Sequence, residues 1–88
     1  MNVVVTKQFA KDVDKELDKS LQLQLADIIE QIKGAKTLQQ IQSIKKLTGY
    51  KTAYRIKLGP YRVGFVYEDN KVKLSRVMHR KEIYRYFP

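Results

Sequence analysis

The sequence predicts an α+β domain made of an N-terminal strand, an antiparallel hairpin of two helices and a three-strand antiparallel meander. Two observations carry this prediction. Apolar residues recur at intervals of three and four between residues 9 and 32, which is the spacing of one helix face. From residue 53 onward they alternate with polar residues, which is the spacing of a strand buried on one side.

The first expected elements are a strand and a helix. Residues 3–5 are consecutive valines, a β-branched run that favours a strand, and Thr6 offers a hydroxyl to cap the first N–H groups of a helix. Beside Ala10, the apolar stripe of this helix repeats every four residues: Phe9, Val13 and Leu17. We therefore expect this stripe to enter the core.

The second helix is expected to run from a cap at Asp18 or Ser20 to a stop at Gly34. Its apolar stripe consists of Leu21, Leu25, Ile28, Ile29 and Ile32. Beyond it, Thr37 and Gln40 have the spacing of a capping box, which predicts a short helix or an ordered cover between residues 37 and 47.

The back half predicts three strands joined by tight turns. The strands and the turns between them are residues 53–58, Gly59 and Pro60, residues 61–68, Asp69 and Asn70, and residues 71–79. Residues 80–86 fit either one helical turn or an extended tail, and the sequence leaves both open.

The expected arrangement packs both helices on one face of a curved sheet and leaves the opposite face for function. Arg55 and Lys57 of the first meander strand and Arg62 of the second point to that free face, because side chains alternate along a strand. A chain of 88 residues, 43% of them apolar, builds one core, so we expect residues 1–88 to form a single domain.

Charge is concentrated in the back half of the chain. Residues 1–44 carry six Lys and six acidic residues, whereas residues 45–88 carry twelve Lys or Arg and three acids, which accounts for the whole net charge of +9. A half with this balance favours a polyanionic partner such as nucleic acid.

Composition excludes several other classes. Cysteine is absent and there is one histidine, which excludes disulfides and thiol nucleophiles and makes a metal site unfavourable. No run reaches the roughly 18 apolar residues of a membrane helix, and no secretion leader follows Met1. We expect a cytoplasmic protein that needs neither a membrane, a metal nor a cofactor.

Two motifs resemble the RelE/ParE superfamily of toxins from toxin–antitoxin systems. The first runs through residues 46–49 (KLTG), 54–58 (YRIKL) and 59–63 (GPYRV), and the second is residues 77–84 (VMHRKEIY). The two occur in the family's order and separation, and the likeness spans nearly the whole chain.

The resemblance implies a RelE-like fold and a ribosome-dependent endoribonuclease, an mRNA interferase that inhibits translation. Its implied partners are the 70S ribosome, mRNA and a cognate antitoxin protein. The catalytic residues it implies are Arg55, Lys57, Arg62, His79, Arg80 and Tyr84. Some members have Lys at the position of Arg55, and the spacing of the C-terminal tyrosines varies, so Tyr84 and Tyr86 are not ranked.

These residue types suit metal-independent cleavage, in which the 2′-hydroxyl of RNA attacks the adjacent phosphorus. Arg62 and Arg80 can hold phosphate oxygens with two-point contacts. His79 is a candidate base, and Lys57 is a candidate acid or base, with the assignment between them open. The hypothesis requires the cations of the sheet to gather in a single pocket.

Further residues are expected to contact RNA through charge or stacking. They are Lys45, Lys46, Lys51, Lys73, Lys81 and Tyr86. Two alternatives remain: a ParE-like toxin that inhibits DNA gyrase without nuclease activity, and a non-catalytic RNA-binding relative. The sequence does not disclose codon preference, the cut position, the antitoxin or the oligomeric state.

Overall fold

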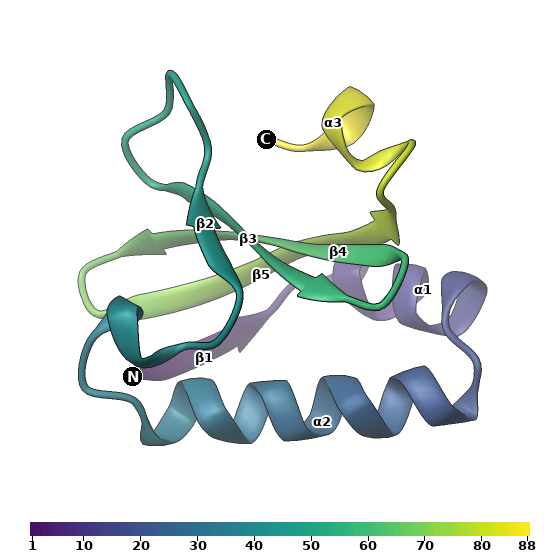
Figure 1. Cartoon of the computed structure of the whole chain (residues 1–88), viewed down its shortest axis with the longest axis horizontal. Coiled ribbons are helices and arrows are strands. Elements are labelled where there is room, and N and C mark those ends of the chain that lie inside the picture. Colours follow the sequence, from purple (N-terminus) through teal and green to yellow (C-terminus); the bar gives the residue numbers. More distant parts are fainter.

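The computed structural model describes residues 1–88 as one five-stranded sheet with helices on both sides of it (Figure 1). In chain order the elements are β1 Asn2–Val5, α1 Lys7–Glu16, α2 Lys19–Gly34, a 3-10 turn Leu38–Gln40, β2 Ile44–Lys46, β3 Ala53–Leu58, β4 Tyr61–Glu68, β5 Lys71–His79 and α3 Ile83–Tyr86. No helix has the length and apolar character required to cross a bilayer.

The sheet has the strand order β1-β5-β4-β3-β2. The predicted antiparallel meander β3-β4-β5 is confirmed, and β1 closes one edge by pairing parallel to β5. The turn between β4 and β5 has left-handed backbone at both Asp69 (φ 51°) and Asn70 (φ 58°), as a two-residue hairpin turn requires. Strand β2, paired antiparallel to β3 at the other edge, was not predicted.

The two long helices begin at side-chain caps. Phe9 N–H donates to Thr6 Oγ1 at 3.1 Å, and Leu21 N–H donates to Asp18 Oδ1 at 2.9 Å. Each cap satisfies one of the backbone donors left free in the first turn. Of the two expected caps for the second helix, the structure therefore selects Asp18.

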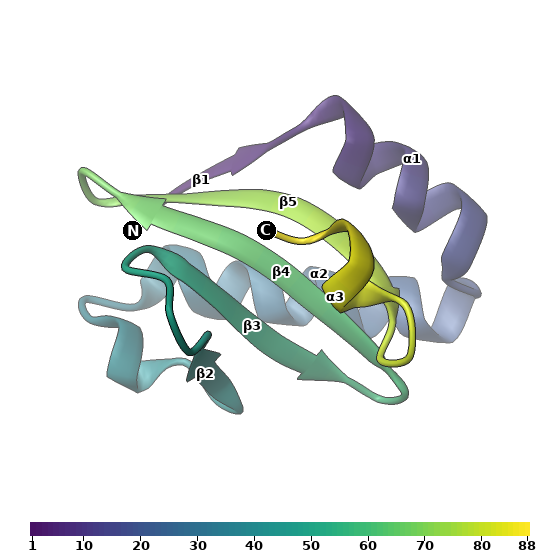
Figure 2. The same cartoon turned by 90° about the horizontal axis from the view of Figure 1, so that it is seen from above.

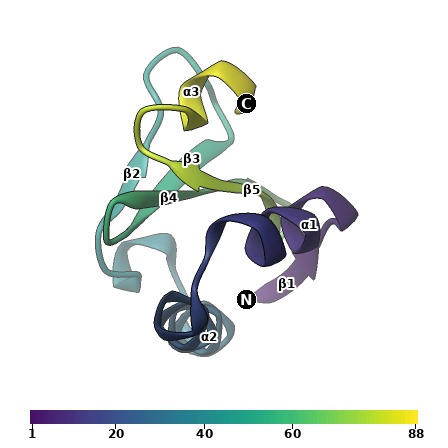
Figure 3. The same cartoon turned by 90° about the vertical axis from the view of Figure 1, so that its right-hand side faces the viewer.

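The helices contact the sheet more than each other. Helix α1 packs mainly on β5, whereas α2 runs back beneath the sheet and contacts β1 and β3. Figures 2 and 3 show α2 below the sheet and α1 beside the end of β5. One broad face of the sheet is therefore left without a long helix.

The main core lies between α1, α2 and the sheet, and it contains the predicted apolar stripes. Its thirteen buried residues are Phe9, Leu17, Leu25, Ile32, Ala35, Ile41, Ile56, Leu58, Val63, Phe65, Val72, Leu74 and Val77. Burial of this apolar surface is the main driving force for folding. Tyr54 and Tyr67 are half-buried against this cluster, and Tyr54 stacks on Phe65 with ring centroids 5.5 Å apart.

The capping box expected at Thr37 and Gln40 is wrong. Thr37 makes no capping bond with its side chain, and Gln40 Oε1 instead accepts from the backbone N–H of Lys36 at 2.7 Å. The helical segment here is a 3-10 turn of three residues, which is too short to present the N–H groups that a capping box satisfies.

The C-terminal segment forms the single helical turn α3, and a second small core attaches it to the face of the sheet opposite α2. Ala53, Ile83 and Phe87 are buried together in this cluster, with Leu47, Val66 and Met78 packed around them. Gly64 of β4 makes room for the Phe87 ring, because a Cβ at Gly64 would lie 2.6 Å from the nearest ring carbon.

We expect Gly64→Ala to loosen α3 and to destabilise the protein by about 1–3 kcal/mol through overpacking. Urea unfolding measures the change. In a Phe87→Ala background the same substitution is expected to have little effect, because the clashing ring is gone. Gly34→Ala is the control, since nothing lies within 4 Å of its added Cβ. An equal loss in both backgrounds would contradict the contact.

Candidate nucleic-acid interface

The expected cations lie on one face of the sheet. Lys57 pairs with Arg62, and Arg55 pairs with Gly64 in the β3–β4 register. Because side chains two apart on a strand share a face, Arg55, Lys57 and Arg62 all emerge on the side away from α2. We call the side of β3, β4 and β5 that carries these three residues the cationic face.

Arg80 and Tyr84 belong to the segment that follows β5. The backbone N–H of Arg80 donates to Pro60 O at 2.9 Å. This bond holds the exposed Arg80 beside the β3–β4 turn, close to the start of β4, where Arg62 lies. Tyr84 is 57% exposed on α3. Figure 2 shows α3 lying over the sheet on the side opposite α2, so α3 borders the cationic face.

None of the expected catalytic cations takes part in an ion pair. The three salt bridges of the protein are Lys33–Glu30, Arg76–Asp12 and Arg85–Glu82. Backbone carbonyls orient two of the guanidinium groups instead. Arg55 Nη1 donates to Ser43 O at 2.8 Å, and Arg62 Nη1 donates to Gly59 O and Tyr61 O, both at 2.9 Å. Their positive charge is therefore free for an anionic ligand.

His79 lies on the other side of the sheet. It pairs with Tyr61, whose ring it meets edge-on with centroids 5.7 Å apart. The register skips Ser75, so that Phe65 pairs with Leu74 and Gly64 with Arg76. This extra residue in β5 is a bulge, and it reverses the alternation of the side chains beyond it. The expectation that His79 joins the cations in one pocket is wrong for this reason.

The hydrogen bonding of His79 also restricts its chemistry. Its Nδ1 accepts from the backbone N–H of Lys81 at 3.1 Å, so the neutral ring carries its proton on Nε2. A base needs a free nitrogen lone pair, and the one lone pair of this tautomer is already engaged. The arrangement suits His79 as a donor through Nε2 better than as a base.

The residues expected to contact RNA do not form one cluster. Lys45 and Lys73 extend the cationic face, since they pair with Arg55 and Val66 respectively, whereas Lys46 pairs with Tyr54 and emerges on the opposite side. The structure places the remaining three on the β2–β3 loop, after β5 and on α3: Lys51, Lys81 and Tyr86. All six side chains are exposed.

Sequence reasoning missed the ion pair between Asp12 and Arg76. Arg76 Nε donates to Asp12 Oδ2 at 2.7 Å and Arg76 Nη2 donates to Asp12 Oδ1 at 3.1 Å, a two-point contact. Asp12 is 4% exposed and also accepts from the backbone N–H of Val77. The available signal was the position of Asp12, three residues after Phe9 and hence on the apolar side of α1.

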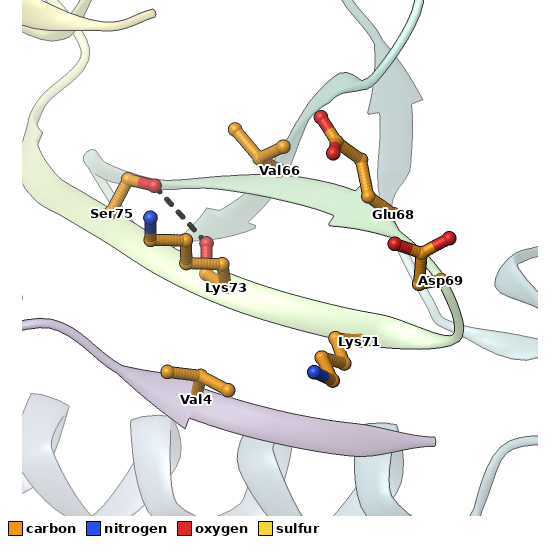
Figure 4. Close-up of a pocket in the computed structure, with 7 residues that line it drawn as sticks. All are labelled: Val4, Val66, Glu68, Asp69, Lys71, Lys73 and Ser75. Carbon is orange, nitrogen blue, oxygen red and sulfur yellow. Dashed lines mark hydrogen bonds between the residues drawn. The ribbon is translucent and has the colours of Figure 1, made fainter.

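Two hollows open on the surface, and neither is lined by the expected catalytic cations. The first, of about 290 Å³, lies near the β4–β5 turn and is lined by Val4, Val66, Glu68, Asp69, Lys71, Lys73 and Ser75 (Figure 4). The second, of about 400 Å³, is lined by Leu38, Gln39, Ile44, Lys46 and Tyr54. Arg55, Lys57 and Arg62 therefore lie on an open face and not in the single pocket that was expected.

An α+β fold with a basic back half and three cations without ion pairs on one sheet face defines a class of protein suited to bind a polyanion. Residues 3–84 match the family model described as the ParE toxin of the type II toxin–antitoxin system parDE. The chain thus belongs to the RelE/ParE superfamily and is a toxin of a type II toxin–antitoxin system.

Individual relatives agree with this membership. Toxin RelE3 of Methanocaldococcus jannaschii is 37% identical, with all of both chains covered. The toxin in the crystal structure of a RelB–RelE antitoxin–toxin complex from Methanococcus jannaschii has a TM-score of 0.82 and 35% identity, covering 97% of this chain and 99% of that one. An archaeal RelE–RelB complex from Pyrococcus horikoshii shares the fold, with a TM-score of 0.72, 23% identity and coverage of 90% and 93%.

Proposed function

We propose that the chain is a ribosome-dependent endoribonuclease that cuts mRNA in the cytoplasm and so inhibits translation. The observation that carries the proposal is the cationic face, where Arg55, Lys57 and Arg62 lie together without a carboxylate partner. A toxin that works by binding a protein surface can use such a set of free cations for contact but does not need it for a reaction. A site that stabilises a phosphorane-like transition state does need one.

The proposed reaction uses the RNA's own nucleophile and no metal. The 2′-oxygen forms a bond to the adjacent phosphorus, the bond from phosphorus to the 5′-oxygen breaks, and a 2′,3′-cyclic phosphate and a 5′-hydroxyl result. A base takes the proton of the 2′-hydroxyl and an acid protonates the departing 5′-oxygen. Arg62 and Arg80 hold the phosphate oxygens, because a guanidinium stays charged and matches their geometry.

Lys57, His79 and Tyr84 are the proposed groups for proton transfer and base stacking. Lys57 is exposed on the cationic face next to Arg62. It is therefore a stronger candidate than His79 for proton exchange with the reacting oxygens. The proposed role of His79 is that of a donor through Nε2, because its Nδ1 accepts from the backbone N–H of Lys81. The exposed ring of Tyr84 is available to a splayed base. Exposed lysines, Lys45 and Lys73 among them, attract the RNA backbone.

Dependence on the ribosome follows from the openness of the site. Neither hollow is lined by Arg55, Lys57 or Arg62, so the toxin by itself does little to hold a flexible RNA strand in the geometry for attack. Fixing the reacting groups in that geometry is a large part of catalysis, and a decoding site that already holds the message supplies it. The ribosome is therefore the proposed source of substrate alignment.

The proposed inhibitor is a cognate antitoxin protein. Two solved relatives are described in complex with RelB antitoxins, and this chain matches one of them over 97% of its length. The net charge of +9 favours an acidic partner segment, because complementary charge speeds association and suppresses wrong partners.

Gyrase inhibition is a second candidate, and the ParE description of the matching family model favours it. That reading requires no cut RNA and assigns the cations to binding. The two candidates are separated by primer extension on a defined message, with and without translating ribosomes, beside an assay of gyrase-cleaved DNA. We expect cuts only with ribosomes. Intact message together with trapped gyrase–DNA complexes would overturn the nuclease proposal.

The ends of the fragments report the chemistry. We expect the downstream fragment to carry a 5′-hydroxyl, so that polynucleotide kinase labels it without prior phosphatase treatment, because attack by the 2′-oxygen leaves phosphorus on the upstream fragment. The measurement compares labelling of the gel-purified fragment before and after phosphatase. A fragment that is labelled only after phosphatase carries a 5′-phosphate, which would mean attack by water.

A further inference from the structure

The contact between Arg76 and α3 is not explained by the proposed chemistry. The guanidinium carbon of Arg76 lies 5.5 Å from the centroid of the Tyr86 ring, within the range of a cation–π contact. Arg76 belongs to β5 and emerges on the cationic face, where it pairs with Gly64. Tyr86 is the last residue of α3. The contact therefore joins α3 to the sheet at a point separate from its buried anchors.

Asp12 fixes the guanidinium of Arg76 from the other side. Its two oxygens accept from Arg76 Nε and Nη2, and the same carboxylate accepts from the backbone N–H of Val77 at 3.1 Å and from Gln8 Nε2 at 3.1 Å. Four hydrogen bonds leave the carboxylate little freedom to move. A two-point contact also fixes the plane of the guanidinium group, which a single bond would not.

The elements involved come from the two ends of the chain. Figure 3 shows α1 beside the end of β5 and α3 above it, on the opposite side of the sheet from α2. The network thus runs from α1, through β5, to α3, and ends two residues from Tyr84. On the side that faces the sheet, α3 is held at both ends: Ile83 packs with Ala53, and Phe87 packs over Gly64. These buried contacts lie on the sheet side of α3, whereas Arg76 contacts it at Tyr86.

We propose that Arg76, clamped by Asp12, is a positioning residue that sets the orientation of α3 and thereby the place of Tyr84 on the cationic face. The catalytic part of this inference rests on the proposed nuclease function. Arg76 acts through Tyr86 and α3, and its guanidinium is committed to Asp12 and to the Tyr86 ring. It does not join Arg62 and Arg80 in holding phosphate.

The first test measures the order of α3 without RNA. Backbone amide order parameters for residues 84–86 are expected in the rigid range, about 0.85, in the wild type and to fall toward the flexible range, below about 0.6, in Tyr86→Leu. Tyr86→Phe keeps the aromatic face and is expected to match the wild type. Both variants leave the buried Asp12–Arg76 pair intact, so the fold is retained. Unchanged order parameters in Tyr86→Leu would overturn the proposal.

The second test asks whether Arg76 acts through Tyr84. We expect Arg76→Lys to lower the rate of ribosome-bound cleavage by about tenfold under single-turnover conditions. Lysine keeps the positive charge but lacks the planar guanidinium group that makes the two-point contact with Asp12. The toxin concentration giving half the maximal rate should not change. In a Tyr84→Ala background, which lacks the stacking ring, the same substitution should add little, since coupled residues are not additive. Full additivity would indicate general destabilisation and contradict positioning.

The two tests separate failure of this inference from failure of the proposed function. A wild type that leaves ribosome-bound message intact removes the nuclease proposal. The order parameters of α3 then decide on their own whether Arg76 holds this helix. Cleavage by the wild type combined with rigid α3 in Tyr86→Leu would retain the nuclease and reject the positioning role.

Discussion

Arg62→Ala is expected to lower the rate of ribosome-bound mRNA cleavage by about 10²- to 10³-fold, the loss that follows removal of one preorganised donor to a developing charge. Arg62 lies beside Lys57 on the cationic face, and its guanidinium is held by the carbonyls of Gly59 and Tyr61 rather than by an acid. Single-turnover primer extension measures the rate. The size of the loss reflects charge that builds up only in the transition state.

Two further variants decide what the loss means. Arg62→Lys keeps the charge but loses the two-point geometry, so we expect it to recover only part of the rate. Lys15→Ala removes one positive charge from an exposed position on α1 and is expected to cleave as the wild type does. If Lys15→Ala slows cleavage as much as Arg62→Ala does, net charge matters and the specific position of Arg62 does not.

Asp12→Ala is expected to lower the free energy of unfolding by about 3–5 kcal/mol, because it leaves a partly buried guanidinium without its counter-charge. The Asp12 side chain is 5% exposed and that of Arg76 is 22% exposed, so solvent screens the pair only weakly. The substitution also removes the acceptor for the buried N–H of Val77. Such a loss is large beside a typical total of about 5–15 kcal/mol.

Urea unfolding of Asp12→Ala and Asp14→Ala tests this expectation. Asp14 is exposed on the same helix, so its substitution is expected to change stability by no more than about 0.5 kcal/mol. Both variants remove a carboxylate from α1, at positions two residues apart. The two carboxylates differ in their burial and in their hydrogen-bond partners. Equal stability of the two proteins would show that the Asp12–Arg76 pair contributes no more than a surface contact.

The local spacing of apolar residues was sufficient to predict the helices and strands that bury a regular apolar stripe. The helical spacing of Phe9 and Leu17 and the alternation from Tyr54 to Leu58 each appear in the core as expected. Strand β2 could not be predicted in this way, because it has three residues and exists through its pairing with β3. Its formation depends on a partner distant in sequence, which a local pattern does not contain.

The sequence predicted the positions of the site residues on the first two strands of the meander, but not those of His79 and α3. Alternation correctly placed Arg55, Lys57 and Arg62 on one face. His79, which the family resemblance placed among the site residues, lies on the other side, because one extra residue in β5 reverses the side to which the residues after it point. The docking of α3 had a weak signal in Gly64, since a glycine within a strand often marks the close approach of another group.

Replacing a single ribose in the message tests most directly whether the 2′-hydroxyl of the RNA is the nucleophile. A ribosome-bound mRNA carrying a 2′-deoxynucleotide immediately before the cut site, and ribose everywhere else, lacks the one nucleophile that the mechanism uses. We expect this message to stay intact at that position while the all-ribose message is cut. Cleavage of both messages at the same rate would contradict it.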